Sequence, residues 1–137
     1  MMMTVSQLSS KGEVLPHVVR YYSRIGLLNP SRHPENGYKL FSSRDLMRLR
    51  FIRQAKRLGF TLDEINQILE TSERQLSPCQ QVREILITRI RENSEKIQEL
   101  LRLQTRMDRA LSKWNKMADQ IPEGDSICHL VESIDAM

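Results

Sequence analysis

The sequence has few of the residues that build a large hydrophobic core. Only three Phe, three Tyr and one Trp occur among 137 residues, and the hydrophobic fraction is 39%. This is too little aromatic and branched apolar mass for one large core, whereas it suits short helices and a solvated coiled coil. The length fits one compact domain, or a small domain with an extended appendage.

Long apolar runs and targeting segments are also lacking. No stretch approaches the roughly 18 apolar residues that a membrane-spanning helix needs. The first four residues are not a charged region followed by an apolar stretch, so no signal peptide is predicted. We therefore expect a cytoplasmic protein. Its two cysteines, Cys79 and Cys128, lie far apart in the sequence, and a structural disulfide is not expected in that compartment.

Residue patterns typical of catalysis are missing as well. The sequence has no Ser/His/Asp arrangement, phosphate-binding loop or catalytic pair of carboxylates, and its three histidines are scattered. We therefore expect a binding protein and not an enzyme. A coiled-coil adaptor protein that does not bind DNA is the alternative to a DNA-binding regulator. Salt-dependent binding of a promoter-length duplex would distinguish a regulator from both.

Charge is distributed unevenly along the chain. Residues 11–57 contain 11 Lys and Arg against three acids, whereas residues 118–137 contain five acids and no Lys or Arg. The net charge is +4. A basic head and an acidic tail indicate a polyanionic partner for the head, although basic solvated surfaces are common.

Two short helices are predicted at the N-terminus, over residues 5–11 and from Pro16 to Gly26. Thr4 is the expected N-cap of the first, and a proline suits the first turn of the second. The turn at Gly12–Glu13 separates them. Two short helices joined by a tight turn that contains glycine are typical of a helix-turn-helix.

A small wing is predicted next, over residues 27–41. Asn36-Gly37 is the preferred pair for a two-residue hairpin turn, and residues 38–41 alternate well enough for a short strand. Two further helices follow. Ser42 or Ser43 caps the first, and Thr61 caps the second.

One long helix is predicted after Ser77-Pro78, extending to about Met117. Its seam positions follow alternating steps of four and three, and hold Cys79, Arg83, Leu86, Ile90, Asn93, Ile97, Leu100, Gln104, Met107, Leu111 and Trp114. Such spacing is typical of a coiled coil. A single helix of this length cannot bury its own stripe, so dimerisation is favoured over packing against its own head. The tail, residues 118–137, is expected to be a loop followed by a short element.

The order of motifs resembles the MerR family of bacterial transcription regulators over roughly the first 70 residues. The matching segments are Thr4-Val5-Ser6-Gln7-Leu8, Val19-Arg20-Tyr21-Tyr22, Gly26-Leu27-Leu28, Asn36-Gly37-Tyr38-Lys39-Leu40-Phe41, Asp45-Leu46, Leu49-Arg50-Phe51-Ile52 and Leu58-Gly59-Phe60-Thr61-Leu62-Asp63-Glu64-Ile65. One small departure is that the common pattern has its first glycine one place after Gly12.

This resemblance implies a mainly all-α fold. Residues 1–77 form a winged helix-turn-helix DNA-binding head, residues 78–117 a dimerisation helix in an antiparallel coiled coil, and residues 118–137 an effector loop with a short tail element. The family binds palindromic promoters as a homodimer and distorts the DNA so that RNA polymerase can use the two promoter elements.

The candidate DNA-binding residues come from the second helix and the wing. A helix-turn-helix places its second helix in the major groove, where Arg reads guanine or clamps phosphate and Tyr binds phosphate. Adjacent tyrosines on a helix cannot both face DNA equally, so we expect one of the pair at 21 and 22 to be mostly buried. The set is His17, Arg20, Tyr21, Tyr22, Arg24, Arg32, Tyr38 and Lys39.

The resemblance also implies a metal site. In metal-sensing relatives, a cysteine at the start of the long helix of one subunit completes a site in the other subunit's C-terminal loop. Cys79, Cys128 and His129 match such a set, whose thiolate and imidazole ligands suit zinc, cadmium, mercury or lead. The first cysteine of that loop is missing here, and Asp119, Glu123 and Asp125 are possible oxygen donors.

Three alternatives to a metal site remain open. Both cysteines could be buried apolar residues. They could instead form a thiol switch that responds to oxidants or electrophiles, which requires a lowered thiolate pKa. Sensing of an organic ligand is disfavoured, because about 20 residues after the coil leave little room for a pocket.

Overall fold

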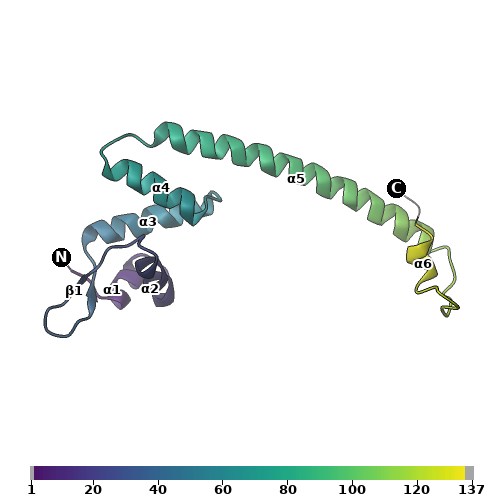
Figure 1. Ribbon diagram of the computed structural model, residues 1–137, viewed down its shortest axis with the longest axis horizontal. Helices are drawn as coiled ribbons and strands as arrows, with labels where there is room; N and C mark the ends of the chain where they lie inside the picture. Colours follow the sequence, from purple (N-terminus) through teal and green to yellow (C-terminus); the bar gives the residue numbers. More distant parts are fainter. Residues whose placement is uncertain (1, 135–137) are drawn as a thin grey trace. The chain divides into compact units, whose positions relative to one another are not determined.

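A computed structural model describes residues 2–134 of the chain (Figure 1). It divides into two compact units, Met1–Arg83 and Glu84–Met137, which are considered separately below. The described elements are α1 (Val5–Lys11), α2 (Pro16–Arg24), β1 (Ser31–Arg32), β2 (Lys39–Leu40), α3 (Ser43–Arg57), α4 (Leu62–Glu73), α5 (Cys79–Trp114) and α6 (His129–Glu132). This confirms the mainly all-α fold class, with a helix-turn-helix, a small hairpin and one long helix.

Three helices of the first unit begin at hydroxyl caps, as predicted. The side chains of Thr4, Ser42 and Thr61 each accept a hydrogen bond from the backbone N–H of the residue three positions later. The side chain of that later residue accepts a hydrogen bond from the backbone N–H of the capping residue in return. Such reciprocal boxes satisfy N–H groups that a helix start would otherwise leave unpaired. Local sequence therefore determines where α1, α3 and α4 begin.

The core of the first unit lies where α1–α4 meet the wing strand. The start of the chain is held beside the end of β2, because Met3 and Phe41, the residue after that strand, exchange two backbone hydrogen bonds of 2.7 Å. The largest fully buried side chains are those of Phe41, Leu8, Leu27, Leu28, Leu49, Ile52, Ile65, Ile68 and Val19. Full burial of each contributes about 1.5–3 kcal/mol, so this small core suffices to hold the helix-turn-helix against α3 and α4.

The wing, residues 31–40, differs from its prediction at the turn. Ser31 pairs with Leu40 and Arg32 with Lys39 in an antiparallel ladder, which leaves residues 33–38 as the connection. The expected two-residue turn at Asn36-Gly37 is therefore wrong. The backbone N–H of His33 donates to the carbonyl of Tyr38, and that of Gly37 donates back to the carbonyl of His33. Pro34 has no N–H for a ladder, so a longer loop replaces the tight turn.

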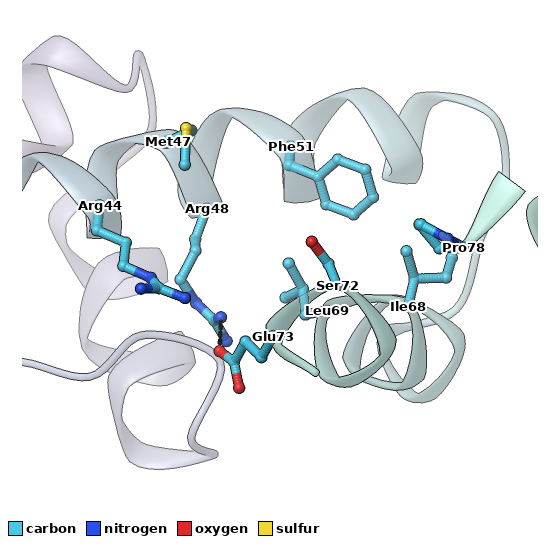
Figure 2. A pocket seen from close by; sticks show the side chains of 9 residues that line it. All are labelled: Arg44, Met47, Arg48, Phe51, Ile68, Leu69, Ser72, Glu73 and Pro78. Atoms are coloured by element: carbon cyan, nitrogen blue, oxygen red, sulfur yellow. Dashed lines mark hydrogen bonds and ion pairs between the residues drawn. The ribbon is translucent and has the colours of Figure 1, made fainter. Parts of the chain in front are cut away.

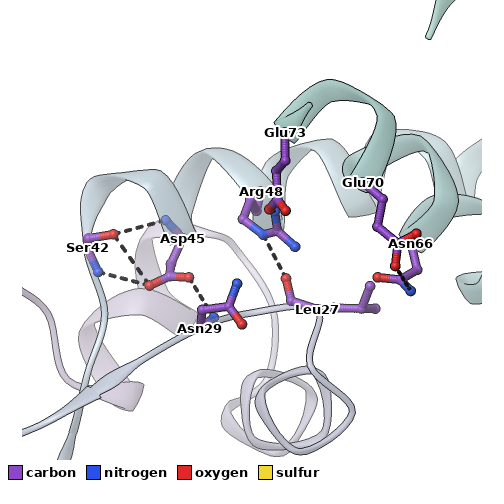
Figure 3. Close-up of polar contacts among 8 residues, drawn as sticks. All are labelled: Leu27, Asn29, Ser42, Asp45, Arg48, Asn66, Glu70 and Glu73. Atoms are coloured by element: carbon purple, nitrogen blue, oxygen red, sulfur yellow. Dashed lines mark hydrogen bonds and ion pairs between the residues drawn. The ribbon is translucent and has the colours of Figure 1, made fainter. Parts of the chain in front are cut away.

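Two charged residues of α3 are buried and hold the segment that leads into the wing (Figure 3). The Asp45 carboxylate accepts hydrogen bonds from the backbone N–H of Asn29, at 3.0 Å, and of Ser42, at 3.1 Å. The Arg48 guanidinium donates to the carbonyl of Leu27 at 2.8 Å and forms an ion pair with Glu73. These contacts link α3, the wing base and the end of α4.

Glu13 occupies a left-handed backbone conformation, with a φ of 57°. The resemblance described above implies a glycine at this position. A non-glycine residue there costs about 1–2 kcal/mol. Glycine removes this cost and adds about 0.5–1 kcal/mol of unfolded-state entropy. The exposed Glu13–Arg53 ion pair contributes little.

We therefore expect Glu13→Gly to stabilise the first unit by about 0.5 kcal/mol, raising its melting temperature by roughly 2–4 °C. Gln75, with a φ of 62°, offers a parallel test, and Gln75→Gly should act in the same direction. The control is Ser10→Gly in the regular helix α1, which should lower stability. Thermal denaturation followed by circular dichroism measures all three. A lower melting temperature for both Glu13→Gly and Gln75→Gly would contradict this account.

In the second unit, α5 ends at Trp114, slightly before the predicted boundary, and is followed by a loop and α6 (Figure 1). Polar contacts join α6 and the residue that follows it to α5 and to the loop. The Lys113 ammonium donates to the carbonyl of Ser133 at 2.8 Å, and an imidazole nitrogen of His129 lies 2.9 Å from the carbonyl oxygen of Ala118. No helix among the described residues is long and apolar enough to cross a membrane.

Candidate nucleic-acid interface and thiol residues

Helix α2 presents one buried and one exposed face. Val19 and Tyr22 point into the core, whereas Arg20 and Arg24 are exposed. His17, near the start of the helix, is exposed as well. Pro16 occupies the first turn, where its missing N–H costs nothing. The helix therefore holds its cationic side chains on the side away from the protein core.

The two adjacent tyrosines of α2 are in different environments, as expected. Tyr22 is 9% exposed and Tyr21 is 41% exposed. Burial, with a smaller effect from the neighbouring Tyr21, raises the pKa of Tyr22 above its ordinary value. The Arg24 guanidinium carbon lies 5.4 Å from the centre of the Tyr21 ring, within cation–π range. Tyr21 is thus the tyrosine that can contact another molecule, while Tyr22 belongs to the core.

A side-chain hydrogen bond joins the wing to α2. The Lys39 ammonium donates to the hydroxyl of Ser23 at 3.3 Å. Within the wing, the Arg32 guanidinium donates to the carbonyl of Gly37 at 3.0 Å and so braces the loop. Tyr38, next to this loop, is 69% exposed. The wing therefore carries an exposed phenol and an ammonium beside the exposed face of α2.

A groove of about 690 Å³ lies between α2 and the wing, and we call it the wing groove. Its lining residues are Thr4, Val5, Ser6, Arg20, Arg24, Tyr38 and Lys39. The structure thus brings together four of the predicted residues and adds the start of α1. Sequence reasoning used Thr4 only as a helix cap, and nothing in the pattern marked residues 4–6 as part of a binding surface. His17, Tyr21 and Arg32 do not line this groove.

Three cations, an exposed phenol and the hydroxyls of Thr4 and Ser6 suit a ligand with closely spaced anionic oxygens. Arg presents a fork of donors that matches phosphate, and Lys provides a mobile point charge. Phosphate contacts of this kind position a duplex, whereas base edges in the groove specify its sequence. The wing groove therefore places cationic and phenolic donors beside the exposed face of α2.

The candidate metal ligands lie in both units. Cys79, the first residue of α5, is exposed, and its backbone N–H donates to the hydroxyl of Ser77 at 3.3 Å. Cys128 is half-buried at the N-cap of α6 and next to His129. Among residues 2–134, no group of three or more His, Cys, Asp or Glu side chains is placed to hold a metal ion.

The donor set still fits a soft or borderline metal. Two thiols and an imidazole are ligands that zinc, cadmium, mercury and lead accept. The His129 Nε2 lies 2.9 Å from the Ala118 carbonyl oxygen. If Nε2 carries the proton, this carbonyl orients the ring and leaves Nδ1 as the ligating nitrogen, a common outer-shell arrangement.

Glu132 orders the segment that presents Cys128. Its carboxylate accepts hydrogen bonds from the hydroxyl of Ser126 at 2.6 Å and from the backbone N–H of Ile127 at 2.9 Å. These two donors hold the pKa of the Glu132 carboxyl below its ordinary value, and the Ser126 hydroxyl has the larger effect. The end of the loop is thereby tied to α6.

A hollow between α3 and α4 was not expected from the sequence (Figure 2). The ring of Phe51 and the side chains of Met47, Leu69 and Pro78 surround it, with the Arg48–Glu73 ion pair at one side. Its volume is about 200 Å³, whereas typical sites for small organic molecules measure about 300–1,000 Å³. This hollow is therefore too small for a typical organic effector.

Comparison with known proteins gives matches along nearly the whole chain. The family described as "MerR HTH family regulatory protein" matches residues 3–72, and the family described as "MerR, DNA binding" matches residues 46–110. A mercuric resistance operon regulatory protein from Bacillus cereus is 29% identical, and the match covers 95% of each chain. The regulator ZntR from Escherichia coli is also 29% identical, over 98% of this chain and 93% of that relative.

Solved structures agree with the sequence matches. A transcription regulator from Ralstonia metallidurans, crystallised in complex with lead(II), superposes with a TM-score of 0.75 at 27% identity. The superposition covers 96% of this chain and 98% of that one. The matched families and relatives are transcription regulators and not enzymes. With its capped helix-turn-helix, wing and long helix, the chain belongs to the MerR family of helix-turn-helix transcriptional regulators.

Proposed function

We propose that this chain is a cytoplasmic, homodimeric regulator that binds a palindromic promoter and alters its transcription in response to a divalent heavy metal. The observation that carries DNA binding is the wing groove, where the cations of α2 and of the wing meet. A dimer with two-fold symmetry presents two such heads, so its operator should contain two inverted half-sites. The residues assigned to DNA contact are His17, Arg20, Tyr21, Arg24, Arg32, Tyr38 and Lys39.

Within this proposal, the regulator acts by distorting DNA at a promoter that RNA polymerase also occupies. Bending or untwisting a duplex has a cost that depends on its sequence, so deformation can be used as a switch. The hydrogen bond from the Lys39 ammonium to the Ser23 hydroxyl supports such a role, because it joins the two elements that would contact the backbone. The metal is the signal that changes the state of the dimer.

Cys79, Cys128 and His129 are proposed to hold the metal, with Cys79 supplied by one subunit and the other two by its partner. Two observations support this assignment. The donor types suit zinc, cadmium, mercury and lead, and the Ala118 carbonyl can orient the imidazole of His129. Relatives that span nearly the whole chain are named for mercuric resistance, and a structural relative was solved with lead(II).

Arg20→Ala tests the DNA-binding part of the proposal. The probe is a duplex from the region upstream of the chain's own gene, compared with a scrambled duplex of equal length. We expect the wild type to bind the first duplex more tightly than the second. Arg20→Ala should lose about 1–3 kcal/mol per half-site, and therefore about 2–6 kcal/mol for a dimer on both half-sites, which is roughly 30- to 10⁴-fold in affinity.

Arg74→Ala is the matched control, because Arg74 is an exposed arginine at the end of α4, outside the wing groove. Fluorescence anisotropy at fixed salt measures all three proteins, since affinity for DNA depends strongly on salt. Equal affinity of Arg20→Ala and the wild type for the upstream duplex would contradict the assignment of Arg20 on α2 to the DNA interface. A wild type that binds neither duplex would contradict the proposed function itself.

A further inference from the structure

The seam of α5 carries two amide side chains among its apolar residues. Asn93 and Gln104 hold seam positions of this 36-residue helix, which is continuous from Cys79 to Trp114 (Figure 1). Both side chains are exposed in the single chain, and neither has a hydrogen-bond partner in the part of the chain that the structure describes. A buried amide without a partner is costly. A second helix that covers the seam must therefore supply partners for both amides.

Two copies of α5 that run in opposite directions can pair these amides with each other. In such a dimer, a step toward the C-terminus of one helix is a step toward the N-terminus of the other. If Asn93 faces the partner subunit's Gln104, every other seam residue from 83 to 114 also faces a seam residue. The layers, with the second residue of each from the partner subunit, are Asn93–Gln104, Ile97–Leu100, Ile90–Met107, Leu86–Leu111 and Arg83–Trp114.

Displacing one helix by seven residues restores contact between the seams but separates the two amides. In one direction the amides face Ile97 and Leu86 of the partner subunit. In the other direction they face Leu111 and Leu100. Both displacements bury the amides against aliphatic side chains, which offer no hydrogen-bond partner. The register with the paired amides is therefore favoured over its two neighbours.

A parallel pair would match each amide with its own copy, but it would also place Arg83 against Arg83. Like charges that face each other across an interface are unfavourable. In the antiparallel register, Arg83 instead faces Trp114 of the partner subunit, and an arginine over an indole ring is a favourable cation–π arrangement. Arg83 is exposed and Trp114 is half-buried in the single chain. The charge pattern of the seam therefore favours the antiparallel pair.

We propose that Asn93 and the partner subunit's Gln104 form a hydrogen-bonded layer that fixes the register of the α5 dimer and selects a second copy of this chain as its partner. The two-fold axis then lies between the seam positions 97 and 100, so each dimer contains this layer twice. A helix with a wholly apolar seam would leave both amides unpaired, which disfavours it as a partner. This inference rests on the homodimer of the proposed function, and adds its register and its selectivity.

Disulfide trapping in the full-length chain tests the register. The parent protein carries Cys79→Ser and Cys128→Ser, so that only introduced thiols react, and melting temperatures establish that each variant folds. A disulfide needs Cα atoms within about 7 Å of each other. Ile90→Cys combined with Met107→Cys should give a covalent dimer under mild oxidation, because the proposed register places these two seam positions opposite each other.

Ile90→Cys alone and Met107→Cys alone should stay non-covalent, whereas a parallel dimer would trap both. Arg83→Cys with Met107→Cys, and Ile90→Cys with Trp114→Cys, are the matched controls for the two displaced registers. A covalent dimer from a single-cysteine variant or from a control pair, in preference to the proposed pair, would overturn the register. Binding of the upstream duplex by the reduced parent would then show that the proposed function stands while this inference fails.

The amide pair itself is tested by Asn93→Leu, Gln104→Leu and the double variant, with Gln98→Leu as the control off the seam. Each single variant leaves the opposite amide without a partner in both layers. Its dimer should therefore be at least about 10-fold weaker than that of the double variant. Sedimentation velocity measures the dissociation constants, and Gln98→Leu should match the wild type. Equal constants for the single and double variants would contradict the proposed layer.

Partner selectivity is tested by subunit exchange between the wild type and the double variant, whose seam is apolar at both positions. A mixed dimer makes both wild-type amides face leucine, so native mass spectrometry should find mixed dimers well below the statistical half. A statistical yield would overturn the selectivity. A wild type that is monomeric at every concentration would instead contradict the homodimer of the proposed function.

Discussion

Leu100→Glu on α5 is expected to convert the protein to a monomer and to abolish tight operator binding. Large apolar side chains recur along the predicted seam and are exposed in the single chain, with Ile97 at 54% and Leu100 at 63%. A helix of 36 residues with such a stripe needs a partner to cover it. Burial of one leucine contributes about 1.5–3 kcal/mol, and a symmetric dimer buries Leu100 twice.

The resulting loss is about 3–6 kcal/mol, or roughly 10²- to 10⁴-fold in the dimer dissociation constant, before the cost of burying a carboxylate is added. Sedimentation velocity over a range of concentrations measures the change, and anisotropy measures the accompanying loss of operator affinity. Gln98→Glu is the matched control, because it introduces the same carboxylate two residues away and off the seam. It should remain a dimer. A dimeric Leu100→Glu would show that the seam does not form the interface.

The head of this protein follows closely from local sequence, for identifiable reasons. Capping boxes at Thr4 and Thr61 join residues only three positions apart, so the local sequence is enough to predict where α1 and α4 begin. The adjacent tyrosines were also predictable in outline, since a helix cannot expose both equally. Which of them is buried depends on what packs against α2, and only the structure identifies Tyr22.

Features that depend on distant residues escaped prediction. Arg48 looks like one of several solvent-facing arginines in the sequence, yet it is buried because the Leu27 carbonyl, 21 positions away, accepts its hydrogen bond. The loop of the wing is longer than the Asn36-Gly37 pair suggested, because pairing between Arg32 and Lys39 determines where the ladder ends. The wing groove likewise needs residues 4–6, which lie far in sequence from Tyr38 and Lys39. These features depend on contacts between residues distant in the sequence, which helical periodicity does not report.

Cys79→Ser is expected to remove most of the metal affinity of the reduced dimer. Structural zinc in small peptides binds with about 10–16 kcal/mol spread over four ligands. One ligand of a set of three or four therefore contributes roughly 3–4 kcal/mol, so its loss should weaken binding about 10²- to 10³-fold. The exposed position of Cys79 at the start of α5 lets a serine replace it without disturbing a core.

Reduced protein is titrated with zinc, cadmium, mercury(II) and lead, and thiolate charge-transfer absorption reports binding. Cys128→Ser should show a similar loss, because the proposed site needs thiolates from both positions. His33→Ala is the control, since this imidazole lies in the wing, away from both cysteines in the sequence. If Cys79→Ser binds every metal as tightly as the wild type does, the assignment of Cys79 to a metal site is wrong. A promoter response to peroxide without any metal would instead assign both cysteines to a thiol switch.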